Sequence, residues 1–306
     1  MKLKFAIENK NQPDPFIFED NGKFYLYVTA LDGVEAYVSD DLFGTWEYVG
    51  IVTDFNNCSE FWAPAVIKIE DTYYMYVACL QDGKRPMHVA RANSPLGPFT
   101  NEKALYNYFA IDADMIQTDK GLFLFYANAR RNERNGLPGT HVFIDRFIDP
   151  YTPENDPKEV LVPEFDEEKY TPGCVDGKLW YTLEGPCWFQ EGQWQYLMYS
   201  AGCYQDDTYH IGYAVAKTTD TDLKNVTFEK VTNNGAFAPL IIKNEFEEGT
   251  GHHSIIRYKG EYYAIYHGRD YIASTSTEYE ERRTARVCKL TVSDGKITAE
   301  RFEDHL

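Results

Sequence analysis

Basic residues are scarce in this chain. Of its 306 residues, 30 are Lys or Arg and 48 are Asp or Glu, so the formal net charge at pH 7 is −18. Nucleic acids and anionic membrane surfaces attract proteins through Lys and Arg, so the charge balance argues against both as partners. A neutral substrate meets no such repulsion. We attribute the acidity to solubility and, in part, to a site lined by carboxylates.

Long apolar runs are also missing. No stretch approaches the ~20 apolar residues that span a bilayer, and the opening MKLKFAIENK lacks the apolar core of a secretory signal. The six cysteines lie far apart with no Cys-x-x-Cys pair, which argues against a zinc cage. We therefore expect a reduced, cytoplasmic protein, although a secreted protein without its signal would look the same. The sequence gives no oligomeric state, so a homo-oligomer stays open.

Amphipathic helical patterns are absent, whereas aromatic residues are abundant. The chain has 24 Tyr, 19 Phe and 5 Trp, which make up 16% of its residues. Tyr and Phe favour the half-buried surfaces of strands. Aromatic rings also suit sugar binding, because a ring face matches the C–H face of a pentose. Most of these rings are nevertheless expected to pack in a core.

One pattern recurs five times along the chain. Each copy has a polar or special residue, a short apolar strand, a turn and an aromatic-rich strand, as expected for a β-hairpin. The copies are DPFIFEDNGKFYLY (14–27), WAPAVIKIEDTYYMY (62–76), IDADMIQTDKGLFLFY (111–126), EGPCWFQEGQWQYLMYS (184–200) and GHHSIIRYKGEYYAIYHG (251–268). Such repetition is typical of a β-propeller, whose blades have roughly 40–50 residues.

The repeats predict an all-β fold, a single five-bladed β-propeller domain over residues 1–306. A β-sandwich is the alternative, but sandwiches seldom repeat one pattern five times. The interruption at residues 145–176 is interpreted as blade-edge strands and loops. Aligning the turns gives one set of equivalent positions: Asp14, Ala63, Asp112, Glu184 and His252.

Equivalent positions on the first strands of the blades converge on the propeller axis. Two aspartates, one glutamate and one histidine would therefore face one another, with Trp62 beside them. Taken singly, Asp14 before Pro15 suits a turn, and Asp112 could cap a turn or pair with an Arg. Together they suit glycoside hydrolysis, which needs a protonated acid and an ionised carboxylate.

The motifs DPFIFEDNGKFYLY, FWAPAV, IDADMI, EGP and GTGHHS, in this order, resemble glycoside hydrolase family 43. The resemblance extends from about Asp14 to the end of the chain. It implies a five-bladed propeller that hydrolyses arabinose- or xylose-containing oligosaccharides with inversion, without a cofactor for the chemistry. Asp14 would be the general base, Asp112 the residue that tunes the pKa of the acid, and Glu184 the general acid. Asp114 competes with Asp112 in the same motif.

The resemblance also implies residues that bind substrate. Trp62 matches a sugar platform, and its neighbour Phe61 is expected to pack in the core. Arg283 matches an arginine that reaches a substrate hydroxyl, with Arg286 as an alternative. His252 matches a histidine near the channel axis that contacts calcium or another ion through water. A hydrogen-bonded structural histidine is the other interpretation, since Ca²⁺ prefers several oxygen ligands.

Several activities remain open at this level. The leading hypothesis is an exo-acting α-L-arabinofuranosidase, because the C-terminal β-sandwich of many family xylosidases is not expected here. A β-xylosidase, alone or combined with the first activity, and an endo-arabinanase are alternatives within the family. The Asn-Asp-Pro-Asn-Gly motif of the related fructan hydrolases does not occur. A non-catalytic carbohydrate-binding propeller is the alternative from another class, but a binder has no need for all three carboxyl groups.

Overall fold

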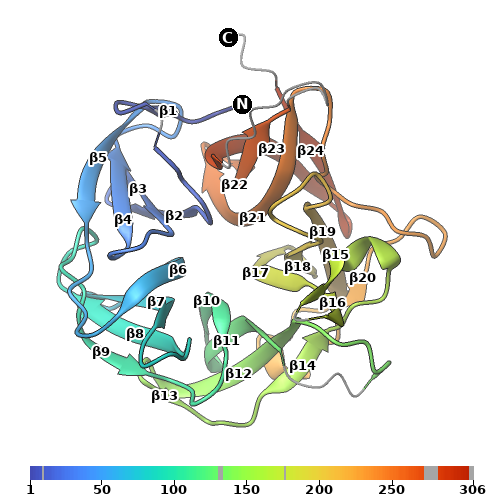
Figure 1. The fold of residues 1–306 in the computed structure, drawn as a ribbon, viewed down its shortest axis with the longest axis horizontal. Helices are drawn as coiled ribbons and strands as arrows, with labels where there is room; N and C mark the ends of the chain where they lie inside the picture. The colour runs from blue at the N-terminus through green and yellow to red at the C-terminus, as the bar shows by residue number, and fades with distance from the viewer. Residues whose placement is uncertain (9, 130–133, 176, 272–281, 303–306) are drawn as a thin grey trace.

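The computed structural model describes residues 1–306 except residues 9, 130–133, 176, 272–281 and 303–306. The described residues form five antiparallel sheets arranged radially around one axis (Figure 1). Each sheet is one blade, and its strands follow one another in the chain from the axis outward. The all-β, single-domain, five-bladed propeller predicted from the repeats is thereby confirmed.

The blades have similar strand sets. Blade one contains β2 (Phe16–Asp20), β3 (Lys23–Val28), β4 (Glu35–Ser39) and β5 (Thr45–Ile51). Blade two contains β6 (Ser59–Ile69), β7 (Thr72–Leu80), β8 (Met87–Ala92) and β9 (Thr100–Ala104). Blade three contains β10 (Ile111–Thr118), β11 (Gly121–Asn128), β12 (His141–Asp149), β13 (Thr152–Pro153) and β14 (Lys158–Leu161). Blade four contains β17 (Leu183–Glu191), β18 (Trp194–Ala201), β19 (His210–Lys217) and β20 (Glu229–Lys230). Blade five contains β21 (Glu247–Tyr258), β22 (Glu261–Asp270), β23 (Thr284–Ser293) and β24 (Lys296–Glu300).

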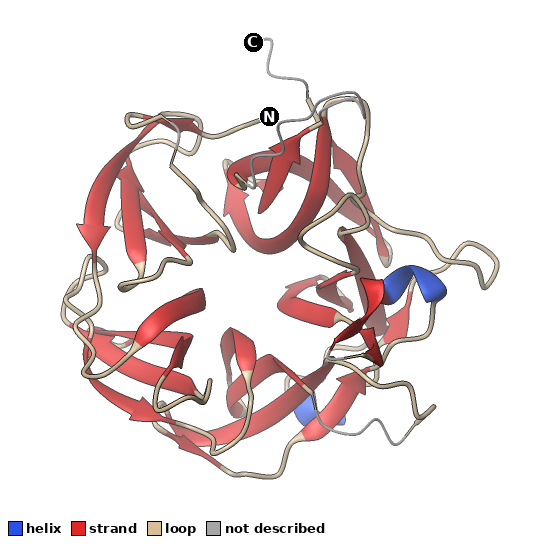
Figure 2. Cartoon of the chain, viewed as in Figure 1, coloured by secondary structure: helices blue, strands red, loops and turns tan. Residues whose placement is uncertain are grey.

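A two-stranded hairpin lies between blades three and four. It is formed by β15 (Lys169–Val175) and β16 (Lys178–Tyr181). The interpretation of residues 145–176 as blade-edge strands and loops agrees with the structure for β13, β14 and their loops, whereas β15 belongs to this separate hairpin and residue 176 lies outside the described residues. Within the described ranges, the only helical segments are two short 3₁₀ turns, Asp166–Glu168 and Leu223–Asn225 (Figure 2). No helix in this part of the chain has the length and apolar character needed to cross a membrane.

Turn chemistry explains why the first two strands of blades one and five form hairpins. In blade one, Asn21 and Gly22 have φ values of 54° and 76°, and in blade five Lys259 and Gly260 have 50° and 87°. Two consecutive positive φ values characterise the type I′ turn, whose twist matches that of the flanking strands. Glycine adopts this conformation at little cost, so these dipeptides fix the strand register.

The core lies between neighbouring blades. Blades one and two, for example, bury Tyr27, Met75 and Phe99 in one apolar cluster. Full burial of a side chain of this size contributes roughly 1.5–3 kcal/mol. Phe61 belongs to the same cluster and is 2% exposed, which confirms its predicted packing role.

A β-bulge recurs near the start of each inner strand. The first bulge residue has a positive φ in every blade; these residues are Asp14, Ala63, Asp112, Gly185 and His252, with φ between 48° and 60°. Four of these bulges appear as register shifts between the first two strands of blades two to five. A non-glycine residue rarely adopts this conformation, so its recurrence points to a site at the axis.

The bulges correct one predicted equivalence. Gly185, rather than Glu184, matches Asp14, Asp112 and His252. Glu184 is the residue before the bulge, as Trp62 is in blade two. Glycine at the strained position leaves the preceding residue to carry the carboxyl group.

The N-terminal segment closes the ring between blades one and five. Its strand β1 (Lys4–Phe5) pairs in parallel with β5, the outermost strand of blade one. Lys2 forms an antiparallel bridge with Arg286 of β23 in blade five. The segment therefore hydrogen-bonds to both blades. We call residues 1–5 the closing segment.

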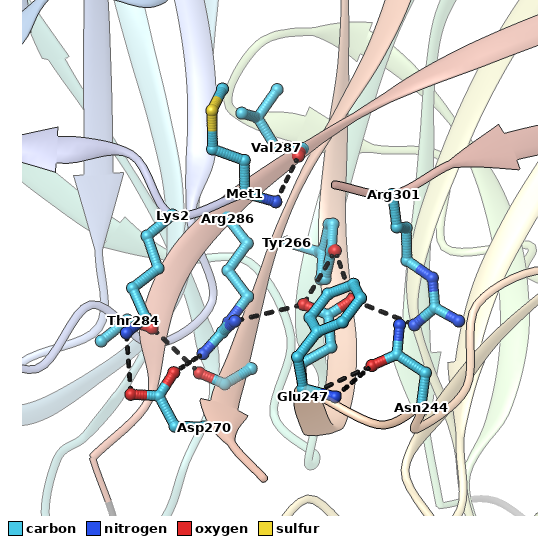
Figure 3. A network of polar contacts seen from close by, with 12 residues as sticks. Met1, Lys2, Asn244, Glu247, Tyr266, Asp270, Thr284, Arg286, Val287 and Arg301 are labelled. Carbon is cyan, nitrogen blue, oxygen red and sulfur yellow. Dashed lines mark hydrogen bonds and ion pairs between the residues drawn. The ribbon is translucent and has the colours of Figure 1, made fainter. Parts of the chain in front are cut away.

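A buried ionic network lies directly under the closing segment (Figure 3). Glu247 is fully buried and accepts hydrogen bonds from Tyr266 at 2.9 Å, Arg286 at 3.3 Å and Arg301 at 3.0 Å. Arg286 also donates to Asp270 at 2.7 Å. A buried carboxylate needs such partners, and removing one typically costs 3–5 kcal/mol.

Candidate active site

A small pocket lies at the axis, where the inner strands begin. It has a volume of about 150 Å³, below the ~300–1,000 Å³ of pockets for drug-sized ligands. All six residues predicted from the sequence to act on or bind substrate line it. The lining residues are Asp14, Thr29, Trp62, Ile111, Asp112, Glu184, Tyr204, Tyr209, His252 and Arg283.

The bulges explain how the pocket is lined. First bulge residues supply Asp14, Asp112 and His252, and the residues before bulges supply Trp62 and Glu184. In blade three two successive positions, Ile111 and Asp112, face the same space. A regular strand would send them to opposite faces, so the bulge gathers the polar groups.

Asp14 has polar partners on both carboxylate oxygens. Thr29 donates its hydroxyl to Oδ2 at 2.5 Å. Near Oδ1 lie Arg283 Nη1 at 3.5 Å, His252 Nδ1 at 3.4 Å and His267 Nδ1 at 3.3 Å. The carboxylate is therefore fixed in orientation and faces a permanent cation.

The charge state of Asp14 follows from these partners. Burial raises its pKa, but the interactions of the carboxylate with His252, Arg283 and His267 outweigh burial and hold the pKa well below its usual range. Burial lowers the pKa of His252, and that of His267 to about 3. Moreover, the Asp14 backbone N–H donates to His267 Nδ1, which must be unprotonated there. Arg283 is thus the cation that keeps Asp14 ionised at neutral pH.

Asp112 and Glu184 form a close carboxyl pair. Ligating atoms of Asp112, Glu184 and His252 all lie within 4.8 Å of one another. The Gly185 backbone N–H donates to Asp112 Oδ2 at 3.0 Å, and the Tyr209 hydroxyl donates to Glu184 Oε1 at 2.5 Å. Each carboxyl group therefore has a donor of its own.

Burial keeps this pair protonated to higher pH than Asp14. It raises the pKa of Glu184 to about 7, with a further contribution from the charge of Asp14, while the Tyr209 hydrogen bond and Arg283 lower it. Burial also raises the pKa of Asp112 well above its usual range, helped by the charges of Glu184 and Asp14. Near neutrality the pocket thus holds an ionised Asp14 beside protonated carboxyl groups. This separation is what acid–base chemistry requires.

Tyr209 is a site residue that the sequence analysis missed. It is fully buried, and its ring lies parallel to His267, with centroids 5.6 Å apart. Gly251 allows this placement, because a Cβ there would overlap the Tyr209 ring. Thr29 was missed as well. Neither residue lies in a repeat motif, so no sequence signal marked them.

Asp114 lies below the pocket. It lines a smaller axial cavity of about 20 Å³ instead, and its Oδ2 accepts a hydrogen bond from the backbone N–H of Trp188 at 2.7 Å. Burial raises its pKa to about 7, although the Trp188 bond lowers it. The geometry thus favours Asp112 over Asp114 as the partner of Glu184.

Trp62 is supported from behind by an arginine. The Arg85 guanidinium lies 3.3 Å from the centroid of the Trp62 ring, a cation–π arrangement. Arg85 also donates to the Glu60 carbonyl at 2.7 Å and pairs with its carboxylate. Trp62 lines the pocket, whereas Arg85 does not. The stack therefore holds the indole in place as a wall.

His252 was also predicted to contact an ion through water. It lines the small axial cavity, together with buried His253, whose two ring nitrogens have no hydrogen-bond partner among the described residues. Ca²⁺ takes six to eight oxygens, and the only carboxylates lining the cavity are Asp14, Asp112 and Asp114. The cavity of about 20 Å³ has room for roughly one water, so these residues supply too few oxygens for a full Ca²⁺ shell. An ion contacted by His252 through water stays a prediction.

Arg283 and Arg286 have different environments. Arg283 lines the pocket, lies 4.8 Å from the Tyr204 ring centroid and faces Asp14. Arg286 is 1% exposed and belongs to the Glu247 network (Figure 3). The geometry therefore favours Arg283 as the substrate-facing arginine.

A larger groove adjoins the pocket. This side groove has a volume of about 410 Å³ and shares Trp62, Ile111, Glu184 and Tyr204 with the pocket. Its other walls are mainly apolar and come from blade three, the β15–β16 hairpin and nearby loops. They are Phe109, Ala129, Thr140, Tyr170, Val175, Trp180, Thr182 and Gly202. Glu184 thus stands at the border between pocket and side groove.

Fold and pocket together define a class of protein. A propeller that places an ionised carboxylate and a carboxylic acid in one axial pocket has the groups for hydrolysing a glycosidic bond. The family model of glycosyl hydrolases family 43 matches residues 5–297. The chain therefore belongs to this family.

Comparisons with individual proteins agree with this assignment. An alignment of 119 positions shows 34% identity to arabinan endo-1,5-alpha-L-arabinosidase C of Emericella nidulans; it covers 33% of this chain and 37% of that enzyme. A thermostable family-43 glycoside hydrolase has a similar structure, with a TM-score of 0.80 and 25% identity over 97% of this chain and 95% of its own. The alpha-L-arabinofuranosidase of Lactobacillus brevis shares the fold, with a TM-score of 0.75 and 19% identity over 94% and 93% of the two chains.

Proposed function

We propose that this protein is an inverting exo-glycosidase that releases terminal L-arabinofuranose from short α-linked arabino-oligosaccharides. The observation that carries the proposal is the contrast between two carboxyl groups in one pocket. The pKa of Asp14 lies well below its usual range, whereas that of Glu184 is raised to about 7. One group is therefore ready to accept a proton and the other to donate one.

In the proposed reaction, Asp14 removes a proton from a water molecule as its oxygen attacks the anomeric carbon. Glu184 gives its proton to the glycosidic oxygen as the carbon–oxygen bond breaks. The products are the free sugar, with inverted anomeric configuration, and the shortened oligosaccharide. Proton exchange with solvent restores both carboxyl groups. Asp112 is the residue assigned to tune the acid, because its carboxyl group forms a close pair with that of Glu184 and two such groups do not readily ionise together.

The shapes of the two spaces support exo action. The pocket of about 150 Å³ suits one sugar unit, and the adjoining side groove suits the leaving portion. Glu184 lines both, which is where the acid must stand to reach the glycosidic oxygen. Trp62 and Arg283 would contact the bound sugar.

An endo-arabinanase is the second candidate. Two observations favour it: the side groove continues from the pocket, and the fungal relative is named as an endo-acting arabinosidase. An endo-enzyme would release internal fragments from polymeric arabinan, whereas the proposed exo-enzyme releases arabinose. Product analysis separates the two.

A cytoplasmic location is a further part of the proposal. The five described cysteines are free, which is compatible with a reducing compartment. Short oligosaccharides taken up by the cell would then be the substrates.

The test compares hydrolysis of para-nitrophenyl α-L-arabinofuranoside and para-nitrophenyl β-D-xylopyranoside. We expect preference for the arabinoside and, in Asp14→Asn, a loss of roughly 10²–10⁴ in kcat. Asp40→Asn is the matched control, because the Asp40 side chain is 85% exposed. Preference for the xyloside would replace arabinose by xylose in the proposal. Inactivity on both substrates and on arabinan would reject catalysis in favour of a carbohydrate-binding propeller.

A further inference from the structure

Two cysteines and a histidine meet at one end of blade two, outside the pocket. They are Cys58, just before β6, Cys79 on β7 and His88 on β8. Their ligating atoms all lie within 4.8 Å of one another. We propose that Cys58, Cys79 and His88 form a binding site for a thiophilic divalent cation, with Zn²⁺ as the ligand of choice.

The spacing of the donor atoms fits tetrahedral coordination. Zn–S bonds of ~2.3 Å and Zn–N bonds of ~2.0–2.1 Å place sulfur and nitrogen ligands roughly 3.5 Å apart. The Cys79 Sγ to His88 Nδ1 distance is 3.3 Å. Cys58 and Cys79 are also within hydrogen-bonding reach of each other. Small side-chain rotations would therefore suffice to complete the three-ligand set.

A further residue orients the histidine. His88 Nε2 lies 3.2 Å from the Gln81 side-chain oxygen, and a proton on Nε2 leaves the Nδ1 lone pair toward Cys79. Ligating histidines usually donate their other ring N–H to an oxygen in this way. Nδ1 also lies 3.2 Å from the Pro86 carbonyl, so the opposite tautomer would donate there in the metal-free protein. Metal binding would select the tautomer of His88 that has its proton on Nε2.

Charge balance favours a divalent ion. Cysteine binds a metal ion as the thiolate, so coordination here would use two thiolates and one neutral imidazole. Two thiolates and one Zn²⁺ form a neutral unit with His88, which suits the apolar surroundings of Cys79. Other charges also face the cluster: Glu102 and Asp82 act on Cys58, Glu102 and Arg85 on Cys79, and Glu102 on His88. Binding would release the two thiol protons.

Access is available on one side. Cys79 and His88 are 0% and 1% exposed, whereas Cys58 is half-buried. Water on the Cys58 side would fill the fourth position. The sequence spacing had argued against a zinc cage, because no Cys-x-x-Cys pair exists. Pairing of the strands of blade two brings the ligands together instead.

The site adjoins the wall of the axial pocket. Gln81 and Pro86 lie in the same β7–β8 turn as Arg85, which stacks on Trp62. A bound ion would join the ends of three strands around this turn. The binding itself is independent of the proposed glycosidase activity and is tested without sugar.

The first experiment titrates the reduced, metal-free protein with Co²⁺ as an optical substitute for Zn²⁺. We expect one equivalent to bind with thiolate-to-cobalt charge-transfer absorption, and Zn²⁺ to displace it. Cys58→Ala and His88→Gln should lose this absorption. The matched control Cys288→Ala, which removes a buried thiol from blade five, should keep it. Absence of the absorption, or its persistence in both ligand variants, overturns the proposal.

A second experiment uses only the unmodified sequence. Iodoacetamide labelling of Cys58 is followed by peptide mass spectrometry with and without one equivalent of Zn²⁺. A coordinated thiolate is shielded, so we expect Zn²⁺ to slow labelling roughly tenfold or more. Equal labelling rates would contradict the site even if the variants failed to fold.

Discussion

The backbone N–H of Gly185 donates to Oδ2 of Asp112 at 3.0 Å, which ties the residue after Glu184 to the neighbouring blade. Because Gly185 is the first bulge residue of β17, this bond fixes the backbone that carries Glu184. Asp112 thus acts on the proposed acid through position, and as the second member of a close pair of carboxyl groups. Replacement of Asp112 would disturb both.

Glu184→Gln tests the acid. The variant keeps size and polarity but cannot donate the proton, so kcat on arabino-oligosaccharides should fall by about 10²–10⁴. An activated para-nitrophenyl leaving group needs less protonation and should lose less. Glu191→Gln, at the far end of the same strand, is the matched control. Full activity of Glu184→Gln on an unactivated disaccharide would reject the assignment.

The pH profile should have its alkaline limb near neutrality. Glu184 must be protonated, and its pKa of about 7 means that kcat/KM falls as pH rises above that value. On the acid side, Asp14 stays ionised to well below its usual pKa, so activity should persist there. Initial rates from about pH 4 to about pH 9 measure the alkaline limb and check that no acid limb lies in that range. A flat profile across neutrality would contradict the assignment of Glu184.

Tyr209→Phe should move the alkaline limb to higher pH. The Tyr209 hydroxyl donates to Glu184 Oε1 and lowers the pKa of that carboxyl group. A hydrogen bond to a charged group contributes ~1.5–3 kcal/mol, which corresponds to a shift of roughly 1–2 pH units. Tyr213→Phe, in the same blade but outside the pocket lining, is the control. An unchanged limb with reduced kcat would assign Tyr209 a different role.

Gly251→Ala should destabilise the protein and lower its activity together. The added methyl would overlap the Tyr209 ring and displace it from Glu184. Overpacking of this kind costs about 1–3 kcal/mol in the free energy of unfolding. Gly235→Ala has open space around the new methyl but a φ of 84°, so it serves as the control for backbone strain without overlap with Tyr209. Urea unfolding and kcat measure the two effects, and an active, equally stable Gly251→Ala protein would show that Tyr209 is not needed.

Trp180→Ala tests the side groove. Trp180 lines it from β16, so its loss should raise KM for arabinotriose by roughly 3–10-fold, the value of one aromatic contact. KM for methyl α-L-arabinofuranoside should change little, since that leaving group does not reach the groove. Leu179→Ala, the exposed neighbour outside the groove lining, is the control. Equal increases in KM for the two substrates would show that the groove does not bind the leaving group.

Repetition made most of the fold and part of the site predictable. Five aligned hairpins indicate five blades, and Asp14 and Asp112 occupy the same position in two of them. The alignment placed Glu184, instead of Gly185, at the position equivalent to Asp14 and Asp112, because an alignment of side chains ignores backbone conformation. Only the positive φ of Gly185 shows which residue begins the bulge.

The missed features depend on contacts between distant segments. Tyr209 lies in the loop just before β19 and donates a hydrogen bond to Glu184. The sequence between the two residues carries no periodic signal. Cys58, Cys79 and His88 likewise meet only through strand register. Spacing rules for metal sites assume ligands that are close along the chain, so they overlook clusters assembled across a sheet.

The closing segment has a bearing on catalysis as well as on the shape of the ring. Asp14 precedes blade one, whereas His252, His267 and Arg283 belong to or adjoin blade five, so the two sides of this ion cluster meet across the seam of the ring. Residues 1–5 connect the two blades across that seam, and the buried Glu247 network supports the blade-five side. The contacts that close the ring therefore also keep Asp14 beside Arg283, which holds down the pKa of the proposed base. Weakening these contacts would separate Asp14 from Arg283, and the pKa of Asp14 would then rise toward that of an ordinary buried carboxyl group.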